Sequence, residues 1–380
     1  MNINVFSLLS RGALPLVAGL LFCSCGTENF VEDTWDRTPM LTYWSDEIII
    51  PSWTSYSSKT ANMVDAAEAF SDNPTATNYD VFKASVLSAY GGWQWVSFLE
   101  IGPGEAENVR YRTNTYPTDT LNVANTALNY NGLNGPNLGL PSTFAQQGFP
   151  AIDFLLNRYE SSDSAATYFS NNEGPRLYIA ALVNELNNAS QAILLEWNTY
   201  RSVFISNDGS SASSSLNKMA NDYVFHYEKE LRAGKIGIPA GVFSGNTYPG
   251  KVEAIFSDTW SSILFNEGLK AHARFFNGVS FDSLVVGPSF SQYLDHLNIR
   301  RDDTTLSFII ANQFNIAKQS AGTITETYST TVGQDVFKML SLFDELQVNT
   351  INMKTDMMQA FNVKVDSVSY THLTLPTILL

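Results

Sequence analysis

The chain has 380 residues, of which 44% are hydrophobic and 13% aromatic, so it contains enough apolar material to bury one large core or two medium ones. Its 22 Lys and Arg stand against 37 Asp and Glu, and the resulting formal charge of -15 argues against nucleic acid as a partner. Cationic ligands are weakly favoured instead.

The first 25 residues predict a bacterial lipoprotein signal. Residues 1–24 contain one basic side chain, Arg11, then an apolar run too short to span a bilayer, then small residues before Cys25. We expect cleavage before Cys25, lipidation of its thiol and anchoring outside the cytoplasm, in the outer membrane of a Gram-negative bacterium. The alternative is an ordinary secretory signal with a free Cys25. Because Cys23 leaves with the signal, the lipidated protein has neither a disulfide nor a thiolate nucleophile.

Both ends of the mature chain are expected to lie outside the packed helices. Residues 25–39 are polar and acidic without an apolar period, which is typical of a tether between a lipid anchor and a domain. Residues 367–380 lack the charged, helical pattern of the segment before them. They resemble the translated adapter read-through found at the ends of metagenome-assembled genes. We therefore predict that the native fold ends near Asp366.

Apolar residues recur every three or four positions over much of residues 40–206, which predicts amphipathic helices and a first helical bundle. Phe82, Val86 and Tyr90 mark one such face. Residues 105–143 are the exception, because Asn, Gly, Pro and Thr dominate there and predict a loop rather than packed helix. A loop of this length is uncommon inside a compact domain, so it is a candidate functional segment.

A polar, serine-rich stretch at residues 207–215 predicts a linker, and helical spacing returns in residues 216–366 as a second bundle. One predicted helix face there runs from Val252 through Phe256 to Trp260. Few segments alternate polar and apolar residues, so strands are expected to be minor. The sequence therefore predicts an all-α fold of two packed helical bundles.

Common catalytic signatures are absent from the sequence. A zinc peptidase of the H-E-x-x-H type needs two imidazoles one helical turn apart, and none of His226, His272 and His296 has such a neighbour. His226 and His272 lie in helical runs, where a solvated or hydrogen-bonded side chain is the simpler interpretation. There is no nucleophile elbow, no Walker loop and no Rossmann glycine pattern.

Several motifs in order along the chain resemble the imelysin-like family, whose hallmark is a Gly-x-His-x-x-Glu motif that opens a helix. They are GGWQWVSFLEIGPGE, YPTD, LPSTFAQQ followed by GFPAIDFLL, LRAGKIGIPAGVFSG and PGKVEAIFSDTWS. The resemblance covers residues 48–366. It implies two antiparallel helical bundles, an extracytoplasmic location and a cleft near the motif. Members are described both as insulin-cleaving metallopeptidases and as iron-regulated proteins tied to metal uptake.

The hallmark motif is altered in this chain. Gly148 matches the family's glycine, Pro150 stands where the family has histidine, and Asp153 replaces the glutamate. A spacing of three places positions 150 and 153 on one helix face, where a histidine and a carboxylate could share a metal. Proline offers no lone pair, although it is compatible with a first helical turn. Asp153 can still coordinate, at a different reach from glutamate.

With the family's histidine absent, a metal would need other ligands. Glu100, Asp119 and Glu253 lie in family-like stretches, and with Asp153 they are candidate ligands through oxygen. An all-oxygen set suits a hard cation such as calcium or ferric iron better than zinc. The sequence thus predicts that any metal bound here is a hard cation.

Each of the three added carboxylates also has a structural interpretation. Glu100 can form a salt bridge with Arg110 or Arg112. Asp119 can cap the helix that follows it, and Glu253 can lie in the first turn of a helix, where the helix dipole favours a carboxylate.

Three functions remain open. The first is a lipid-anchored, non-catalytic protein that binds a ligand in the cleft between the bundles, within an iron-acquisition system and with a transporter as a possible partner. The second is a metallopeptidase with a rebuilt site, whose cleavage would be sensitive to chelators and lost in Asp153→Ala. The third is a surface lipoprotein that captures glycan or peptide. Exposed tryptophans flanking residues 105–143 would favour sugar stacking, whereas buried Trp93, Trp95 and Trp197 would leave no platform.

Overall fold

The computed structural model describes residues 33–364. The predicted signal, the lipidation site Cys25 and the predicted non-native tail at residues 367–380 lie outside the described residues. Residues 33–36 form no regular element, and the first helix begins at Arg37, inside the predicted tether.

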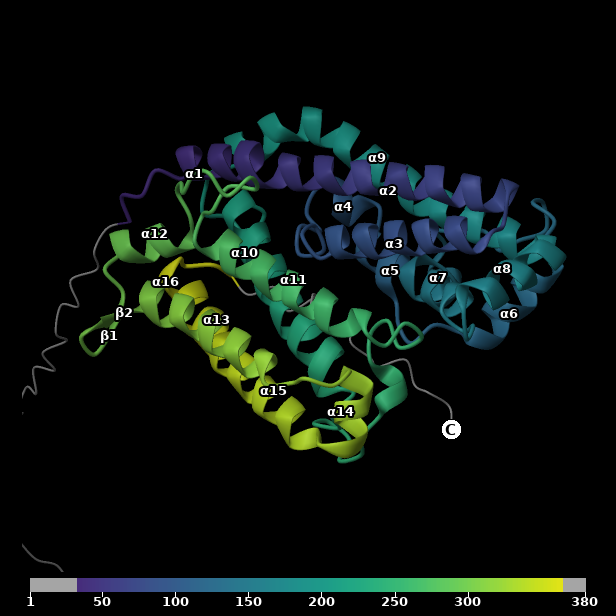
Figure 1. The fold of residues 1–380 in the computed structure, drawn as a ribbon. Coiled ribbons are helices and arrows are strands. Elements are labelled where there is room, and N and C mark those ends of the chain that lie inside the picture. The colour runs from purple at the N-terminus through teal and green to yellow at the C-terminus, as the bar shows by residue number, and fades with distance from the viewer. Residues whose placement is uncertain (1–32, 365–380) are drawn as a thin grey trace, which may run out of the picture. The chain divides into compact units, whose positions relative to one another are not determined.

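Helices account for nearly all the regular structure in residues 33–364, which confirms the all-α prediction. Those of the N-terminal half, whose α-helices are labelled in Figure 1, are α1 (Arg37–Tyr43), the π-helix η1 (Trp44–Ile49), α2 (Ile50–Asp72), α3 (Ala76–Trp93), α4 (Pro103–Ala106), α5 (Val109–Asn114), α6 (Thr120–Asn129), the 3-10 helix η2 (Pro141–Gln146), α7 (Gly148–Leu156), α8 (Ser162–Asn171) and α9 (Glu173–Ser206).

The elements of the C-terminal half are α10 (Ser215–Phe225), the π-helix η3 (His226–Gly237), the 3-10 helix η4 (Pro249–Lys251), α11 (Trp260–Phe276), α12 (Phe290–His296), the strands β1 (Arg300–Arg301) and β2 (Thr304–Thr305), α13 (Leu306–Gly322), α14 (Tyr328–Gln334), α15 (Val336–Ile351), the π-helix η5 (Asn352–Met357) and α16 (Met358–Ala360). The two short strands pair antiparallel, and both join α12 to α13 as a hairpin.

In the N-terminal half, α2 packs against both α3 and α9, and these three helices form its frame (Figure 1). Local sequence fixes where the helices begin. The hydroxyl of Thr75 accepts a hydrogen bond from the Asn78 N–H at the start of α3. Ser161 and Ser164 form a reciprocal capping box at the start of α8.

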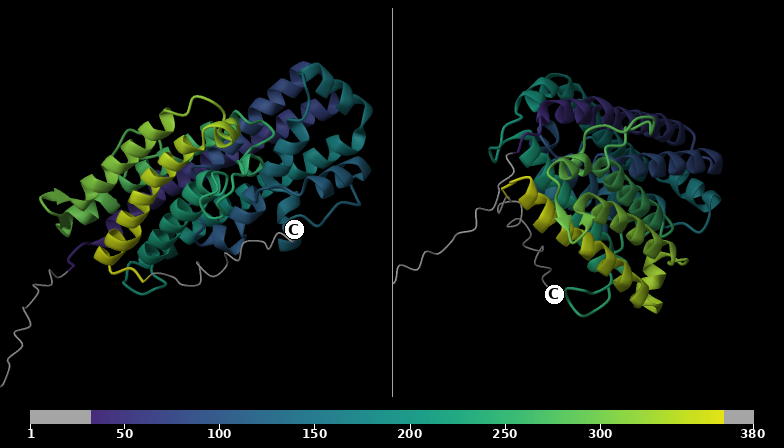
Figure 2. Two further views of the ribbon diagram at one scale, coloured as in Figure 1. Left: turned by 90° about the horizontal axis from the view of Figure 1, so that it is seen from below. Right: turned by 90° about the vertical axis from the view of Figure 1, so that its left-hand side faces the viewer.

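In the C-terminal half, α13 and α15 pack side by side, and η3 packs against both α11 and α15 (Figure 2). The methionines of the last helical turns, Met353, Met357 and Met358, are buried. Because flexible thioether side chains fill irregular gaps, these residues belong to the core of this half.

The loop predicted for residues 105–143 is partly wrong, because the end of α4, all of α5 and α6, and part of η2 lie in it. Asp119 accepts a hydrogen bond from the Asn122 N–H at 3.1 Å and so caps α6, as its structural interpretation predicted. Side chains such as Asn, Asp and Thr favour caps as well as turns, so a composition rich in them also fits short capped helices.

The helix face predicted from Val252 to Trp260 is also wrong. α11 begins only at Trp260, and residues 252–259 form turns in which Ala254 and Asp258 have φ of 53°. These positive φ values are unusual for residues with a side chain, and such backbone persists only where its surroundings hold it. The contacts that hold these turns belong to the candidate site.

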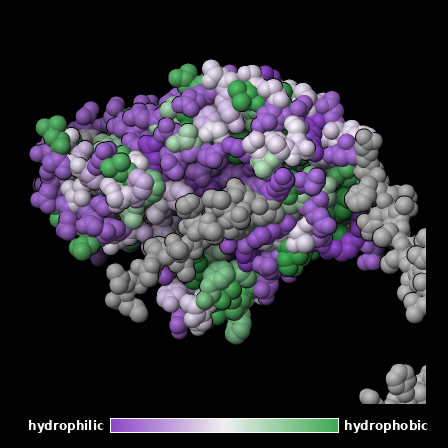
Figure 3. Space-filling view, turned by 180° about the vertical axis from the view of Figure 1, so that it is seen from behind, coloured by the Kyte–Doolittle hydropathy of each residue, from purple (hydrophilic) through white to green (hydrophobic). Residues whose placement is uncertain are grey.

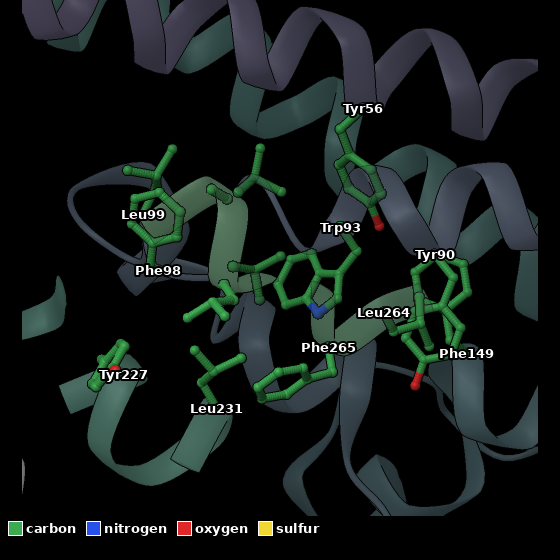
Figure 4. Close-up of a cluster of buried hydrophobic side chains, with 14 of the residues drawn as sticks. Tyr56, Tyr90, Trp93, Phe98, Leu99, Phe149, Tyr227, Leu231, Leu264 and Phe265 are labelled. Atoms are coloured by element: carbon green, nitrogen blue, oxygen red, sulfur yellow. The ribbon is translucent and has the colours of Figure 1, made fainter. Parts of the chain in front are cut away.

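The buried core contains residues from both sides of the 207–215 segment (Figure 4). The Trp93 ring lies 5.8 Å from the Tyr56 ring, and the Phe98 ring lies 5.8 Å from that of Tyr223. Burial of each such aromatic side chain contributes about 2 kcal/mol or more to folding. α9 ends at Ser206 and α10 begins at Ser215, while the division into two bundles at this loop stays a prediction.

Hydrophilic residues cover most of the face shown in Figure 3, with apolar residues in scattered patches. Exposed apolar side chains include Leu133, Leu284 and Phe337. Within residues 33–364, no helix combines the length and the apolar character needed to cross a bilayer.

Candidate functional site

The altered motif opens α7, and its glycine is required by the backbone. Gly148 has a φ of 73°, and a Cβ placed there would lie 2.2 Å from the carbonyl oxygen of Thr113 on α5. Only glycine allows this close approach of α7 to α5. The next residue, Phe149, stacks on Tyr90 of α3 with ring centroids 4.4 Å apart.

Pro150 lies buried in the first turn of α7, as its sequence position predicted. Its ring nitrogen belongs to a tertiary amide, so it has no lone pair to donate to a metal. The position that holds histidine in the family motif therefore cannot supply a ligand here.

Asp153 is 1% exposed, and its carboxylate holds the turns that precede α11. It accepts hydrogen bonds from the backbone N–H groups of Phe256 and Ser257, both at 3.0 Å, and from Asn157 Nδ2 at 2.9 Å. Burial raises the pKa of Asp153 to about 6, against the lowering effect of these donors. The carboxylate that was predicted to bind a metal therefore already accepts hydrogen bonds from the end of α7 and from the turns before α11.

The turns held by Asp153 carry Glu253, which is 2% exposed. One carboxylate oxygen of Glu253 accepts from Asn114 Nδ2 at 2.8 Å and from the Tyr90 hydroxyl at 3.2 Å. The other forms an ion pair with the buried ammonium of Lys235 on η3. Glu253 therefore joins α3, α5 and η3, and it does not lie in a first helical turn.

Arg110 on α5 forms a second buried ion pair, with two carboxylates. Its guanidinium lies 2.7 Å from Glu100 and 2.7 Å from Asp222 on α10, and it also donates twice to the carbonyl of Ser97. Glu100 accepts from the Arg110 backbone N–H as well, which confirms the salt-bridge interpretation of Glu100. Burial raises the pKa of Glu100 to about 7 and also raises that of Asp222, while Arg110 opposes both shifts.

Glu230 on η3 lies between these two ion pairs. It has no hydrogen-bond or ion-pair partner in residues 33–364, and burial raises its pKa. Electrostatic contact links Glu230 to both cations and to the three other carboxylates, Glu100, Asp222 and Glu253. We call this group the charged centre; its members are Glu100, Arg110, Asp222, Glu230, Lys235 and Glu253.

Two buried histidines adjoin the charged centre. His226 Nδ1 lies 3.3 Å from His272 Nε2, and His272 Nδ1 lies 2.9 Å from the carbonyl oxygen of Gly268. Because a carbonyl only accepts, His272 carries its proton on Nδ1, and His226 must then donate from Nδ1. His226 Nε2 is left with a lone pair and no hydrogen-bond partner among the described residues. Burial keeps both imidazoles neutral, lowering the pKa of His272 to about 4.

A cavity of about 10 Å³ lies within the charged centre, and its lining includes Gln94, Arg110, Asn114, His226, Glu230 and Lys235. This volume accommodates one water molecule or one ion. The π-helical backbone of η3 supplies three of these lining residues. Such backbone is rare and is found frequently at functional sites, where it changes the direction of side chains.

The four predicted ligands are not brought together as one coordination sphere. Asp119 caps α6, Glu100 pairs with Arg110, and Asp153 binds backbone N–H groups. Within residues 33–364 no three His, Cys, Asp or Glu side chains are placed to hold a metal ion together. The residues at α7 therefore do not fit the metal that the family motif implies.

The sequence pattern did not point to Glu230 or Lys235, although one signal was present. Asp222, His226 and Glu230 follow one another at intervals of four in a segment that is otherwise rich in aromatic and aliphatic residues. Three ionisable side chains on one stripe of a buried helix are costly unless they meet partners from elsewhere. Such a stripe is a sequence signal for an internal polar site.

The raised pKa of Glu100 predicts that the protein loses stability as pH rises. Because the folded-state pKa of about 7 exceeds the ordinary 4.5, the stabilisation is complete below pH 4.5 and is lost as pH passes 7. Relative to Glu100→Gln, wild-type unfolding free energy should fall by about 3 kcal/mol between pH 4.5 and about pH 8. Urea unfolding across this range measures it, with the exposed Glu326→Gln as control. A Glu100→Gln protein with the wild-type pH dependence would contradict the assignment.

Comparison with known proteins gives one family and a consistent set of relatives. The Imelysin family model matches residues 49–350. Iron-regulated protein A of Synechococcus elongatus is 22% identical over 326 residues, which cover 81% of each chain.

Two solved structures have the same fold. An imelysin-like protein from Psychrobacter arcticum aligns with a TM-score of 0.67 at 15% identity and covers 87% of this chain and 96% of its own. A candidate iron-regulated protein A precursor from Parabacteroides distasonis aligns with a TM-score of 0.71 at 11% identity and covers 85% and 94%. At these identities the structural likeness concerns the fold alone.

Proposed function

Because the chain belongs to the imelysin family, we propose that it is a non-catalytic, lipid-anchored member that binds a cation in the charged centre as part of iron acquisition. The observation that carries this proposal is the excess of negative charge among buried and half-buried side chains. Four carboxylates of the charged centre meet only two cationic side chains. Buried charge without a partner is costly, so the centre favours either protons or a bound cation.

Two groups beside the cavity are available to such a cation. Glu230 offers a carboxylate without a partner among the described residues, and His226 offers the Nε2 lone pair. Imidazole nitrogen together with carboxylate oxygen suits iron among the common biological metals. Water and amide oxygens from Gln94 or Asn114 would have to complete the coordination, because no third ligand of the usual types is placed there in residues 33–364.

The proposal of a non-catalytic protein rests on α7. A hydrolytic metal needs protein ligands and an open position for water. Pro150 has no lone pair, and both oxygens of Asp153 already accept hydrogen bonds. A peptidase centre at the family motif therefore has no support in this chain.

The proposed iron role draws on the relatives as well. Two of them are named as iron-regulated protein A or a precursor of it. A lipid on Cys25 would keep the protein at the outer membrane, where a transporter could take over the bound ion. Membrane fractionation of the wild type and of Cys25→Ser checks the anchor, because the variant should appear in the soluble fraction.

Capture of glycan by stacking on indoles has less support. Trp93 and Trp197 are fully buried, so neither offers a platform. Trp95 is half-buried, and its indole N–H donates to Glu267 at 2.7 Å. Arg274 lies 5.1 Å from the Trp95 ring, so a guanidinium already packs against this indole.

Calorimetry with the mature protein in detergent tests the cation proposal. Fe²⁺ without oxygen, Mn²⁺, Ca²⁺ and Zn²⁺ are each titrated into wild type, Glu230→Gln and the exposed control Glu326→Gln. We expect one Fe²⁺ per chain in the wild type and the control, and at least about ten-fold weaker binding in Glu230→Gln, because the variant lacks the free carboxylate. Equal affinity in the two variants, or no binding of any cation, would contradict the proposal.

A further inference from the structure

We propose that a separate groove beside α2 and α11 binds a small organic anion through its carboxylate group. The groove has a volume of about 210 Å³ and is lined by side chains that include Ser52, Lys59, Gly92, Trp95, Glu267 and Arg274. It shares no lining residue with the cavity of the charged centre. The inference is therefore independent of the proposed cation site.

Two hydrogen-bond donors on the groove lack acceptors in residues 33–364. The hydroxyl of Ser52 has no partner although the residue is 2% exposed, and the ammonium of Lys59 forms no ion pair. Arg274 contributes charge rather than a free donor, because its Nη2 already donates to the carbonyls of Ser280 and Phe281 and its Nε–H is buried without a hydrogen bond. Buried hydroxyls normally have a hydrogen-bond partner, so the Ser52 hydroxyl, together with the half-buried ammonium of Lys59 on the same groove, indicates a ligand that brings the acceptor.

The local charge of the groove has the opposite sign to that of the chain. Lys59 and Arg274 line it, and Lys270 lies 5.4 Å from the Trp95 ring. The carboxylate in the lining, Glu267, already accepts from the Trp95 indole and lies 4.0 Å from Lys270. Arg274 also has the exposed Asp282 as an electrostatic neighbour. A cationic groove in a protein of formal charge -15 selects an anion over a neutral or cationic molecule.

Gly92 on α3 leaves the space in which the Lys59 side chain packs. A Cβ at Gly92 would lie 2.9 Å from Lys59 Cδ and 3.6 Å from its Nζ. The lysine stem therefore lies across Gly92, and this packing restricts the positions that its ammonium can take. A preorganised cation binds a carboxylate better than a mobile one, because less conformational freedom is lost on binding.

The size and walls of the groove define the rest of the ligand. Trp95 and Phe281 contribute aromatic surface, with ring centroids 5.9 Å apart. A volume near 210 Å³ is below that of sites for drug-sized molecules. The fitting class is a small carboxylate with a compact apolar body. Lys59 can bind the carboxylate oxygens, Ser52 can donate a further hydrogen bond, and the guanidinium of Arg274 adds positive charge beside them.

Ligand-observed NMR and calorimetry with benzoate, acetate, citrate and inorganic phosphate test this site, with benzamide as the neutral match to benzoate. The proteins are wild type, Lys59→Met, Ser52→Ala and the control Lys338→Met, which removes a lysine from α15. We expect the wild type and the control to bind benzoate, with benzamide at least about ten-fold weaker. Lys59→Met should lose at least about ten-fold in benzoate affinity, and Ser52→Ala about three-fold.

Four results would overturn the proposal. They are equal binding of benzoate and benzamide, equal benzoate affinity in Lys59→Met and Lys338→Met, preference for phosphate over every carboxylate, and no binding of any carboxylate at about 10 mM. Ser52→Ala supplies a second, milder change should Lys59→Met not fold. If the charged centre binds no cation while this groove binds benzoate, the cation proposal fails and the proposal for the groove stands.

Discussion

Asp153→Ala is expected to lower the free energy of unfolding by about 4 kcal/mol at pH 7.5, because it leaves two buried backbone donors without an acceptor. The N–H groups of Phe256 and Ser257 both donate to this carboxylate, and the residue is 1% exposed. The strained turn at Ala254 and Asp258 would also lose its anchor. Urea unfolding followed by circular dichroism measures the loss.

Two further variants test the reason for this effect. Asp153→Asn keeps one acceptor oxygen but turns an amide group toward the other donor, so it should lose about half as much stability as Asp153→Ala. Asp65→Ala removes an exposed carboxylate from α2 and should change stability by less than about 0.5 kcal/mol. The losses should be the same with and without a chelator. A loss seen only when metal is present would instead restore Asp153 as a ligand.

Arg110→Met is expected to lower the free energy of unfolding by a similar amount, about 4 kcal/mol, because it leaves Glu100 and Asp222 buried without their cation. The guanidinium lies 2.7 Å from each carboxylate, and Arg110 is 6% exposed. It also donates twice to the carbonyl of Ser97, which would lose both donors. Thermal and urea unfolding at neutral pH measure the change.

The matched control for Arg110→Met neutralises its partners. Adding Glu100→Gln and Asp222→Asn removes the uncompensated charge, so the triple variant should recover at least half of the lost stability. Lowering the pH should also reduce the loss in Arg110→Met, because protonation of Glu100 and Asp222 removes the same charge. A triple variant that is less stable than Arg110→Met would show that the contacts of Arg110, and not its charge, stabilise the fold.

The sequence predicted the helices well where one face of a helix meets the core. The faces that contain Phe82, Val86 and Tyr90 in α3 follow from periodicity, since burial of a single stripe imposes a helical period. Predictions were wrong where side chains from distant segments decide the backbone. Residues 252–259 carry a helical pattern, yet the N–H groups of Phe256 and Ser257 bond to Asp153, about a hundred positions earlier in the chain.

For the motif and the candidate site, too, the sequence determined some features and the tertiary structure decided the others. The sequence by itself determined the all-α class, the resemblance to the imelysin family and the loss of an imidazole at Pro150, because each depends only on residue type, spacing or the chemistry of one side chain. Only the tertiary structure decided which carboxylates meet. Glu253 faces Lys235, Arg110 lies between Glu100 and Asp222, and His226 bonds to His272. These contacts join residues far apart in sequence, and their energies depend on burial and distance, which no local pattern encodes.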